Sequence, residues 1–466
     1  MKKQPNILFI LMDDMGWRDL GCTGSAFYET PNIDRLAREG MMFTQGYAAC
    51  PVCSPTRASL LTGKYPARLG VTDWIDNGGG LHPCRGALVD APYVKHLDLA
   101  ERNLARALRD AGYATWHVGK WHLGKEPYWP EKQGFDVNVA GCEWGAPWGN
   151  NTYFSPWKFP TLANGPDGEY LPDRLADEAV KLIENRDPSK PFFLNYWEYC
   201  VHHPIQAKPE KIEKYRQKAA ALGLDKETAL IEGEHFPSEH KKHLRVTRRI
   251  IQSDPAYAAM IESVDDNIGR ILDTLDAQGI ADNTIVIFTS DNGGLSTAEG
   301  SPTSNLPLAE GKGWMYDGGV REPLLVRLPG VVAAGSVCHE PVTSPDFYPT
   351  ILDVASLPPC HGQHVDGVSF MPLLKGDSSF KRGAMFWHYP HYGNQGGTPG
   401  SSVREGDWKL IEFFEDGRLE LYNLREDPGE SKNLAIKRPE VTARLHALLK
   451  DWRAEVCAIL PERNIT

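Results

Sequence analysis

NILFILMDD, residues 6–14, is a run of six apolar side chains that follows Asn6 and ends in two adjacent carboxylates. The run is far shorter than the roughly 20 apolar residues that span a bilayer, and it suits a strand buried on both faces. Such strands belong to parallel sheets covered by helices, whose ligands bind at the carboxyl ends of the strands. The segment therefore predicts an α/β fold with a functional group at Asp13 and Asp14.

Short β-rich runs and helical patterns alternate along the chain after this segment. Four further runs are predicted as strands: Tyr113–Val118, Phe192–Trp197, Thr284–Thr289 and Leu324–Arg327. Three segments are predicted as helices: one from Pro31 to Gly40, one with Ala100, Leu104 and Leu108 on one face, and one around Tyr257–Leu275. This alternation predicts a large, mostly parallel sheet sandwiched by helices.

The texture of the sequence changes after about Gly376, where short strands and a final amphipathic helix replace the earlier pattern. We therefore predict a catalytic α/β domain over residues 1–375 and a smaller α+β domain over residues 376–466, with a short antiparallel sheet and a terminal helix. Residues 208–250 are charged and helical in pattern, with Pro237 as a break. They are predicted to form a solvated helical insertion.

Composition excludes several classes of partner. The chain has 466 residues and a net charge of -11, which argues against nucleic acid, because phosphate binding needs a basic surface. No segment is long and apolar enough to predict a membrane span. No small-residue cleavage site follows the first apolar run, so we expect a cytoplasmic protein, or a periplasmic or secreted one if a signal peptide has been removed. The nine cysteines do not fix the redox compartment, and the sequence does not predict an oligomeric state.

Polar residues follow four of the predicted strands. Asp13-Asp14 follows the first, Gly119-Lys120-Trp121-His122 the second, His202-His203-Pro204 the third and Ser290-Asp291-Asn292-Gly293 the fourth. Taken alone, each acidic pair is also a common turn or cap sequence. Placed together at one edge of a sheet, Asp13, Asp14, Asp291 and Asn292 offer only oxygen ligands, which suits Ca²⁺ or Mg²⁺ rather than Zn²⁺.

The sequence CPVCSPTR at residues 50–57 is a second unusual stretch. Its two cysteines have C-x-x-C spacing, which is compatible with a redox pair or with half of a zinc site, but no second such pair completes a zinc site. Ser54 and Pro55 are predicted as the N-cap and first residue of a helix. Cys53 is then expected just before that helix, where the helix dipole favours an anion.

The stretch Cys53-Ser54-Pro55-Thr56-Arg57 resembles the signature of the formylglycine-dependent sulfatases, a family with an alkaline phosphatase-like fold. Further motifs that resemble those of the family occur in the same order along nearly the whole chain. They include Pro5–Gly16, Ala58–Gly63, Gly119–Gly124, Gly311–Gly313, Gly318–Pro323 and Leu421–Leu434. In that family the cysteine of C-x-P-x-R is oxidised to an aldehyde by a maturation enzyme. Cys50 lacks the proline and arginine at the required offsets, so the resemblance selects Cys53.

The resemblance implies roles for specific residues. It implies metal binding by Asp13, Asp14, Asp291, Asn292 and the modified Cys53. It implies that the sulfate group is surrounded by Arg57, Lys120, His122, His202 and Lys312. The family pattern His-x-Pro selects His202 over His203, which is expected to be a structural or solvent-facing neighbour. Members of the family often have an additional polar residue between the Lys120 motif and His202. We assign no counterpart to it near Gly141–Trp148.

The resemblance also implies a mechanism. One hydroxyl of the hydrated aldehyde, acidified by the cation and Arg57, attacks sulfur, and Lys120 and Lys312 hold the sulfuryl oxygens. His202, with help from Lys312, protonates the leaving alcohol. His122 accepts the proton of the second hydroxyl, so that sulfate is expelled and the aldehyde restored.

Residues outside these motifs are expected to set substrate specificity, because aromatic faces stack on sugar rings and charged groups recognise hydroxyls or carboxylates. The candidates are Trp74, Asp76, Trp144, Trp148, His388, His391 and Arg404. Arg404 is favoured because it precedes the strand Trp408–Phe413, which in the family approaches the pocket. The similarity to bacterial carbohydrate sulfatases implies a sulfated glycan or small molecule as substrate.

Three alternative functions have their own sequence support. A phosphodiesterase or phosphonate monoester hydrolase would share the fold and the metal site. A glycan-binding protein on an inactive scaffold is a second alternative, but every implied catalytic position holds a competent residue. A redox protein could use Cys50 and Cys53, but this function gives no role to Pro55 or Arg57.

Overall fold

The computed structural model describes residues 4–76, 82–363 and 365–465. Within these ranges, nine strands form one main sheet in the order β11-β2-β10-β9-β1-β6-β4-β5, with β12 beside β2. The strands are β1 Asn6–Met12, β2 Met41–Tyr47, β4 Ala114–Gly119, β5 Val137–Val139, β6 Phe192–Trp197, β9 Thr284–Ser290, β10 Arg321–Arg327, β11 Ser336–Cys338 and β12 Val342–Thr343. The predicted mixed α/β fold with a large, mostly parallel sheet is confirmed.

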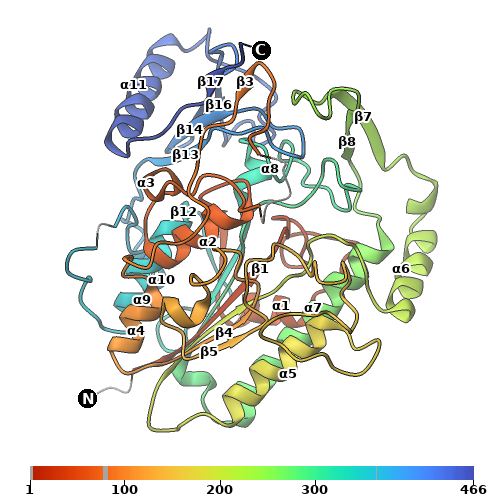
Figure 1. Ribbon diagram of the computed structural model, residues 1–466, viewed down its shortest axis with the longest axis vertical. Coiled ribbons are helices and arrows are strands. Elements are labelled where there is room, and N and C mark those ends of the chain that lie inside the picture. Colours follow the sequence, from red (N-terminus) through yellow and green to blue (C-terminus); the bar gives the residue numbers. More distant parts are fainter. Residues whose placement is uncertain (1–3, 77–81, 364, 466) are drawn as a thin grey trace.

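Helices cover both faces of this sheet (Figure 1). The α-helices are α1 Pro31–Glu39, α2 Cys53–Thr62, α3 Pro66–Leu69, α4 Leu104–Asp110, α5 Leu171–Glu184, α6 Pro209–Ala221, α7 Pro255–Ala277, α8 Asp317–Val320, α9 Phe347–Val354, α10 Met371–Leu374 and α11 Pro439–Glu455. Short 3-10 helices are η1 Pro130–Gln133, η2 Leu224–Lys226, η3 Ala281–Asn283 and η4 Ser344–Asp346.

Strand β1 shows why the sheet is buried on both sides. Its alternate side chains enter two different cores: Leu8 and Ile10 pack with α1, α5 and α7, whereas Ile7 and Phe9 pack with α2, α4 and α9. Every residue of β1 is buried. The uninterrupted apolar run is therefore needed, because an alternating pattern would leave one of the two helical layers without a partner.

Two helix starts differ from the prediction. Asn103 caps α4 through a hydrogen bond from the Arg106 amide to its side chain, so the helix begins at Leu104 and Ala100 lies outside it. Helix α2 begins at Cys53 rather than after Ser54. The Ser54 hydroxyl does not cap the helix because it donates to the His122 carbonyl (2.9 Å) and accepts from the Ile75 amide (3.0 Å).

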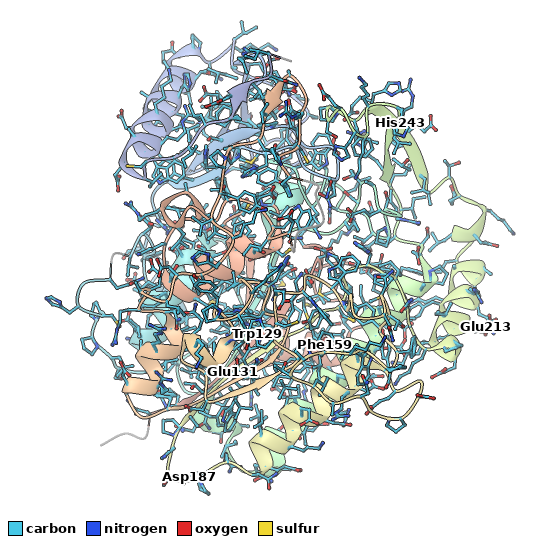
Figure 2. The ribbon with its side chains drawn as sticks, in the orientation of Figure 1. Trp129, Glu131, Phe159, Asp187, Glu213 and His243 are labelled. Atoms are coloured by element: carbon cyan, nitrogen blue, oxygen red, sulfur yellow. The ribbon has the colours of Figure 1, made fainter. Side chains whose placement is uncertain are left out.

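The segment 208–250 is helical only in its first half, in α6. The prediction of a helical insertion is wrong for the second half, where β7 Leu230–His235 and β8 Arg245–Arg249 form an antiparallel hairpin. Arg248 explains the strand structure in part, since it joins Glu234 of the hairpin to Glu310 outside it. Figure 2 shows Glu213 of α6 and His243 of the hairpin directed away from the body of the molecule, and both are exposed.

A separate four-stranded antiparallel sheet follows near the C-terminus, as predicted. Its strands are β13 Met385–Tyr389, β14 Gly400–Glu405, β15 Trp408–Phe413 and β16 Leu419–Asn423, and α11 packs on it. Close to the C-terminus, β17 Glu462–Arg463 pairs with β3 Leu88–Val89 at the top of Figure 1. The domain boundary between residues 375 and 376 stays a prediction. None of the helices in the described ranges combines the length and apolar content that crossing a bilayer requires.

A buried ion cluster joins the small sheet to the rest of the protein. Lys409 Nζ on β15 lies 2.8 Å from Asp317 Oδ1 of α8 and 2.9 Å from Glu430 Oε1, and all three side chains are fully buried. We expect Lys409→Met to destabilise the protein by about 3–5 kcal/mol, because it leaves two buried carboxylates without their cation. Chemical denaturation measures this loss. Lys450→Met, at an exposed position of α11, is the control, and an equal effect of the two changes would contradict the prediction.

Candidate active site

Four neighbouring parallel strands end at one edge of the main sheet. Because β4, β6, β1 and β9 lie side by side and run in the same direction, their carboxyl ends place Lys120, His202, Asp13 and Asp291 on the same side of the molecule. Lys120, Asp13 and Asp291 are fully buried, and His202 is nearly so. The sequence-based expectation that these strand ends gather polar groups at one place agrees with the structure.

Two cations hold the carboxylates of Asp13 and Asp291. Lys120 Nζ donates to Asp13 Oδ2 at 2.5 Å. Arg57 Nε donates to Asp291 Oδ2 at 2.9 Å, and its Nη2 lies 3.9 Å from Asp13 Oδ1. Arg57 also donates from Nη1 to the Lys120 carbonyl at 3.0 Å, which fixes the guanidinium in the protein interior. These contacts neutralise part of a large buried negative charge.

Asp14 is the centre of a second set of contacts. Lys312 Nζ donates to Asp14 Oδ2 at 2.7 Å, and Asn292 Nδ2 donates to Asp14 Oδ1 at 2.9 Å. His202 Nε2 lies 3.8 Å from Asp14 Oδ2. Asp14 has a positive φ of 61°, in the left-handed region, and this conformation turns the chain sharply after β1. The carboxylates of Asp13 and Asp14, although consecutive in the chain, can therefore both contribute to one site.

Cys53 is the first residue of α2 and faces His122. The Cys53 Sγ to His122 Nδ1 distance is 3.4 Å, and His122 Nε2 lies 2.8 Å from the Ile75 carbonyl oxygen. A carbonyl can only accept, so Nε2 carries the proton and the neutral ring presents an unprotonated Nδ1 to residue 53. The position of Cys53 at the start of α2 also agrees with the expected stabilisation of an anion by the helix dipole.

Burial and charge shift the pKa values of these groups in consistent directions. Burial raises the pKa of the Cys53 thiol, against the lowering effect of Lys120. Burial and then the Lys120 cation lower the pKa of His122, and burial and then Lys312 lower that of His202. Burial lowers the pKa of Lys312, but Asp14 raises it above its ordinary value. The two histidines are therefore neutral, and an unmodified Cys53 is a protonated thiol and a weak nucleophile.

Acidic clusters at this site could bind a metal ion. Ligand atoms of Asp13, Cys53 and Asp291 lie within 4.8 Å of one another, and so do those of Asp13, Asp14 and His202. Asp13 Oδ1 and Asn292 Oδ1 are buried and have no hydrogen-bond partner among the described residues. Unpaired oxygens inside a protein are costly unless a cation or water binds them. The donor set, mostly carboxylate and amide oxygen, fits a hard divalent cation.

The site opens into a pocket of about 650 Å³. Cys53, His122, His202 and Lys312 lie in its lining. Four of the predicted specificity residues also line it: Trp74, Asp76, Trp144 and Trp148. Asp76 pairs with Lys95, which orients its carboxylate. A pocket of this size with aromatic walls and a few polar groups suits a sugar-sized ligand.

Three predicted specificity residues are not in this lining, and the structure corrects those predictions. His388, on β13, is hydrogen-bonded to Ser401 Oγ (2.7 Å) and the Ile459 carbonyl (2.9 Å). His391 is fully buried. Arg404 donates to the Tyr47 hydroxyl at 2.5 Å and lines a different, larger groove of about 1090 Å³.

The structure adds residues that the sequence did not identify. His203, Lys241, Glu299, Asn394 and Gln395 also line the pocket. His203 lies 3.8 Å from Glu299 and is packed against Trp148, so it is a member of the pocket wall rather than a purely structural neighbour. Lys241 comes from the turn of the hairpin in segment 208–250, and no local sequence signal marks it. The Gly-rich stretch 393–397 is a signal for Asn394 and Gln395, and no such signal marks Glu299.

Comparisons with known proteins agree with this geometry. The model of the family described as Sulfatase matches residues 5–357, and that described as N-sulphoglucosamine sulphohydrolase, C-terminal, matches residues 310–455. The human N-acetylgalactosamine-6-sulfatase is 35% identical over 99% of this chain and 88% of its own length. A protein named Sulfatase from Formosa agariphila is 32% identical over 97% of this chain and 89% of its own length. The crystal structure of Ps i-CgsB in complex with k-i-k-neocarrahexaose has a TM-score of 0.75 and 27% identity, and the match covers 97% of this chain and 93% of that one.

Proposed function

Since the chain belongs to the sulfatase family and is a sulfuric ester hydrolase, we propose that it hydrolyses a sulfate ester on a carbohydrate. We further propose that Cys53 acts after oxidation to formylglycine, with Ca²⁺ as the cofactor. The observation that carries this proposal is the meeting of four parallel strand ends and Arg57 around Cys53, with two buried lysines beside it.

The residues at the site fit both the divalent cation and the formylglycine. Asp13, Asp14, Asp291 and Asn292 would hold the cation, and the modified residue 53 would complete the set. When bound, the cation would stabilise negative charge on the sulfuryl oxygens. The hydrated aldehyde would supply two hydroxyls on one carbon, a chemistry that a thiol lacks. Mg²⁺ is the alternative cation, since both ions take oxygen ligands.

The surrounding side chains bind and orient the sulfate group. Lys120 and Lys312 provide cations held in place by Asp13 and Asp14, so they need no rearrangement when negative charge develops. Arg57, fixed by Asp291, holds a third positive charge beside residue 53. Three fixed cations around residue 53 favour a compact anion such as sulfate.

The two histidines can move protons at defined atoms. His122 presents its unprotonated Nδ1 to residue 53, which places it to accept a proton there. His202 Nδ1 lies 2.8 Å from the His203 carbonyl, so the Nε2 atom of His202 is available to the pocket. We propose that His202 donates a proton to the leaving alcohol from Nε2. Burial and Lys312 lower the pKa of His202. The negative charge of the bound substrate would therefore have to raise this pKa before His202 could carry the proton.

The pocket walls support a carbohydrate as the leaving group. Trp74, Trp144 and Trp148 offer aromatic faces that stack on sugar rings, and Asp76 and Lys241 offer charged groups for hydroxyls or acidic substituents. The names of the human relative and of the Ps i-CgsB complex with k-i-k-neocarrahexaose also refer to sugars. We propose two partners accordingly: a sulfated sugar as substrate, and a maturation enzyme that generates the formylglycine.

A rate comparison tests the reaction type. Matured enzyme is supplied with a sulfate ester, a phosphate diester and a phosphonate monoester of one aryl alcohol, followed by defined sulfated mono- and disaccharides that include 6-O-sulfated N-acetylgalactosamine. We expect the highest kcat/KM for a sulfated sugar and a higher value for the aryl sulfate than for either phosphorus ester. A preference for a phosphorus ester would instead support the phosphodiesterase or phosphonate monoester hydrolase alternative.

A further inference from the structure

Four buried side chains meet behind the pocket wall, and we refer to them as the four-residue cluster: Asp73, His82, Asp90 and His391. Their side chains are at most 4% exposed. Three of them come from residues 73–90, and His391 comes from about 300 residues later in the sequence. His82 Nδ1 lies 3.5 Å from Asp73 Oδ2 and 3.3 Å from Asp90 Oδ2. His391 Nδ1 lies 3.7 Å from Asp73 Oδ2, and ligand atoms of Asp73, Asp90 and His391 lie within 4.8 Å of one another.

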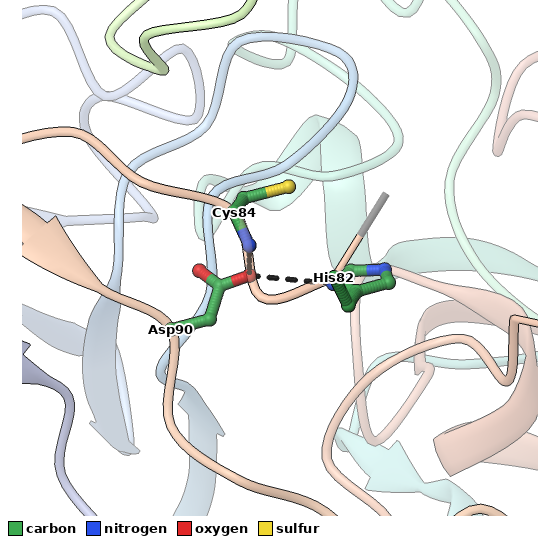
Figure 3. A group of neighbouring side chains, drawn as sticks. All are labelled: His82, Cys84 and Asp90. Carbon is green, nitrogen blue, oxygen red and sulfur yellow. Dashed lines mark hydrogen bonds and ion pairs between the residues drawn. The ribbon is translucent and has the colours of Figure 1, made fainter. Parts of the chain in front are cut away.

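The inner atoms of the cluster face one another, and Figure 3 shows the Asp90 carboxylate directed at the His82 ring. Asp73 Oδ2 and His391 Nδ1 are buried and have no hydrogen-bond partner in the part of the chain that the structure describes. Both residues are fully buried. Two orphan polar atoms of complementary type, aimed at one point in the protein interior, indicate a missing binding partner.

The outer atoms of three of the residues are held by hydrogen bonds. Asp73 Oδ1 accepts from the Trp74 amide (2.8 Å) and the Tyr389 hydroxyl (3.0 Å). Asp90 Oδ1 accepts from the Tyr392 amide at 2.9 Å. The Nε2 atom of His391 is hydrogen-bonded to Thr72 Oγ1 at 2.8 Å, which leaves Nδ1 directed at the cluster. Metal ligands are usually oriented by such outer partners.

We propose that the four-residue cluster binds a structural Zn²⁺ ion, separate from the cation beside Cys53. Zinc is bound by imidazole nitrogen and carboxylate oxygen in a tetrahedral set, whose neighbouring ligand atoms are about 3.3 Å apart for bonds of about 2.0 Å. Three of the six ligand-pair separations are measured, His82–Asp73, His82–Asp90 and His391–Asp73, and at 3.3–3.7 Å they are close to that spacing. The mixed nitrogen and oxygen set distinguishes this cluster from the oxygen-rich site at Asp13 and Asp291.

A buried ion network without metal is the alternative, with His82 protonated between Asp73 and Asp90. That arrangement pairs His82 Nδ1 but leaves Asp73 Oδ2 and His391 Nδ1 facing each other at 3.7 Å without a hydrogen bond. A metal ion satisfies both atoms at once. All four positions would be protein ligands, so the zinc would have no open position for substrate and would be structural rather than catalytic.

The position of the cluster gives the zinc a role in shaping the pocket. Asp73 directly precedes Trp74, Ile75 and Asp76, which line the pocket, and the Ile75 carbonyl holds His122. His391 follows β13 of the small sheet. A zinc ion would therefore fasten the pocket segment to the C-terminal sheet and to the chain around Asp90.

Zinc titration of the full-length protein tests the proposal. After dialysis against a mild chelator, Zn²⁺ is added in competition with a chromogenic chelator. We expect one tight site in the wild type and a loss of affinity of at least about 100-fold in His391→Gln, because even the loss of an outer partner costs about 10–100-fold. His388→Gln is the matched control, since it changes a buried histidine of β13, three residues before His391, that lies outside the cluster. It should keep the wild-type affinity.

Asp291→Ala separates this site from the active site. It removes a ligand of the proposed catalytic cation, and we expect it to retain the tight zinc site even where sulfate ester hydrolysis is lost. Absence of tight zinc binding in the wild type, or its loss in Asp291→Ala, would overturn the proposal.

A spectroscopic measurement on the wild type is independent of whether any variant folds. The zinc K-edge absorption spectrum of the loaded protein should show only nitrogen and oxygen neighbours, with the scattering pattern of two imidazoles. A sulfur neighbour would overturn the ligand assignment, because it would place the ion toward the Cys84 thiol, which approaches His82 and Asp90 but not Asp73 or His391.

Discussion

Cys53→Ala is expected to reduce sulfate ester hydrolysis to background, a loss of roughly 10³-fold or more, as is usual when a catalytic nucleophile is removed. The change deletes the atom that faces His122 Nδ1 and the lysine pair. The fold should survive, because only a small side-chain group is lost from the start of α2 and the carboxylate–cation contacts around it remain. Steady-state rates on the best sulfate ester, together with a thermal unfolding curve, measure both effects.

Cys50→Ala is the matched control for this variant. Cys50 is also buried, lies three residues earlier and is not in the pocket lining. It should retain activity, whereas a redox pair would need both thiols. Substantial hydrolysis by Cys53→Ala, or equal inactivation by a folded Cys50→Ala, would contradict the proposed nucleophile.

Asp291→Ala is expected to lower both the affinity for the divalent cation and the rate of hydrolysis, each by more than about 100-fold, since outer-shell changes alone cost about 10–100-fold. The variant removes an oxygen donor and leaves Arg57 without its main partner. Ca²⁺ bound after dialysis, measured by elemental analysis, gives the metal content, and initial rates with added Ca²⁺ give the activity.

The loss of a buried ion pair could itself destabilise the protein, so a second buried pair serves as the control. Arg382 Nε lies 2.8 Å from Asp346 Oδ2, both side chains are buried, and neither lines the pocket. Asp346→Ala should lower stability by a similar amount without removing the bound cation. Unchanged Ca²⁺ content in Asp291→Ala would contradict the oxygen-ligand site.

The parallel sheet and its functional edge were predictable because both depend on local patterns. β1, β6 and β9 are mostly apolar and are buried along their whole length, which marks strands covered on both faces. The polar residues after these strands lie together because adjacent parallel strands have a common direction. A short continuous pattern was therefore sufficient to place Asp13, Lys120 and Asp291 near one another.

Other parts of the fold depend on tertiary contacts that local patterns do not contain. Strand β2 was not predicted, because its burial alternates irregularly and it pairs with β10, which lies more than 270 residues later. The hairpin of β7 and β8 has a charged sequence that also suits a solvated helix, and Arg248 stabilises it through Glu310 outside the hairpin. Pairing between segments so far apart in the sequence depends on the packing of the folded core and not on a local sequence pattern.

The misplaced specificity residues have a similar explanation. Arg404 lies on β14 and His388 on β13, two paired strands of the small sheet. Their side chains form hydrogen bonds with residues outside the pocket lining. In a strand, successive side chains point to opposite faces, so a strand can approach a pocket while a given residue faces away from it. Lys241 reaches the pocket from an insertion whose own sequence gives no indication of that contact.

The burial of α2 has a consequence for the timing of maturation in the cell. Every residue of α2 is enclosed, and the Cys53 side chain shares its environment with Pro55 and Arg57 of the C-x-P-x-R signature. An oxidising enzyme that recognises those side chains cannot reach them once the protein has folded. The proposed oxidation must therefore occur on the newly made chain, and a protein that folds first would be committed to its inactive thiol form for as long as it stays folded.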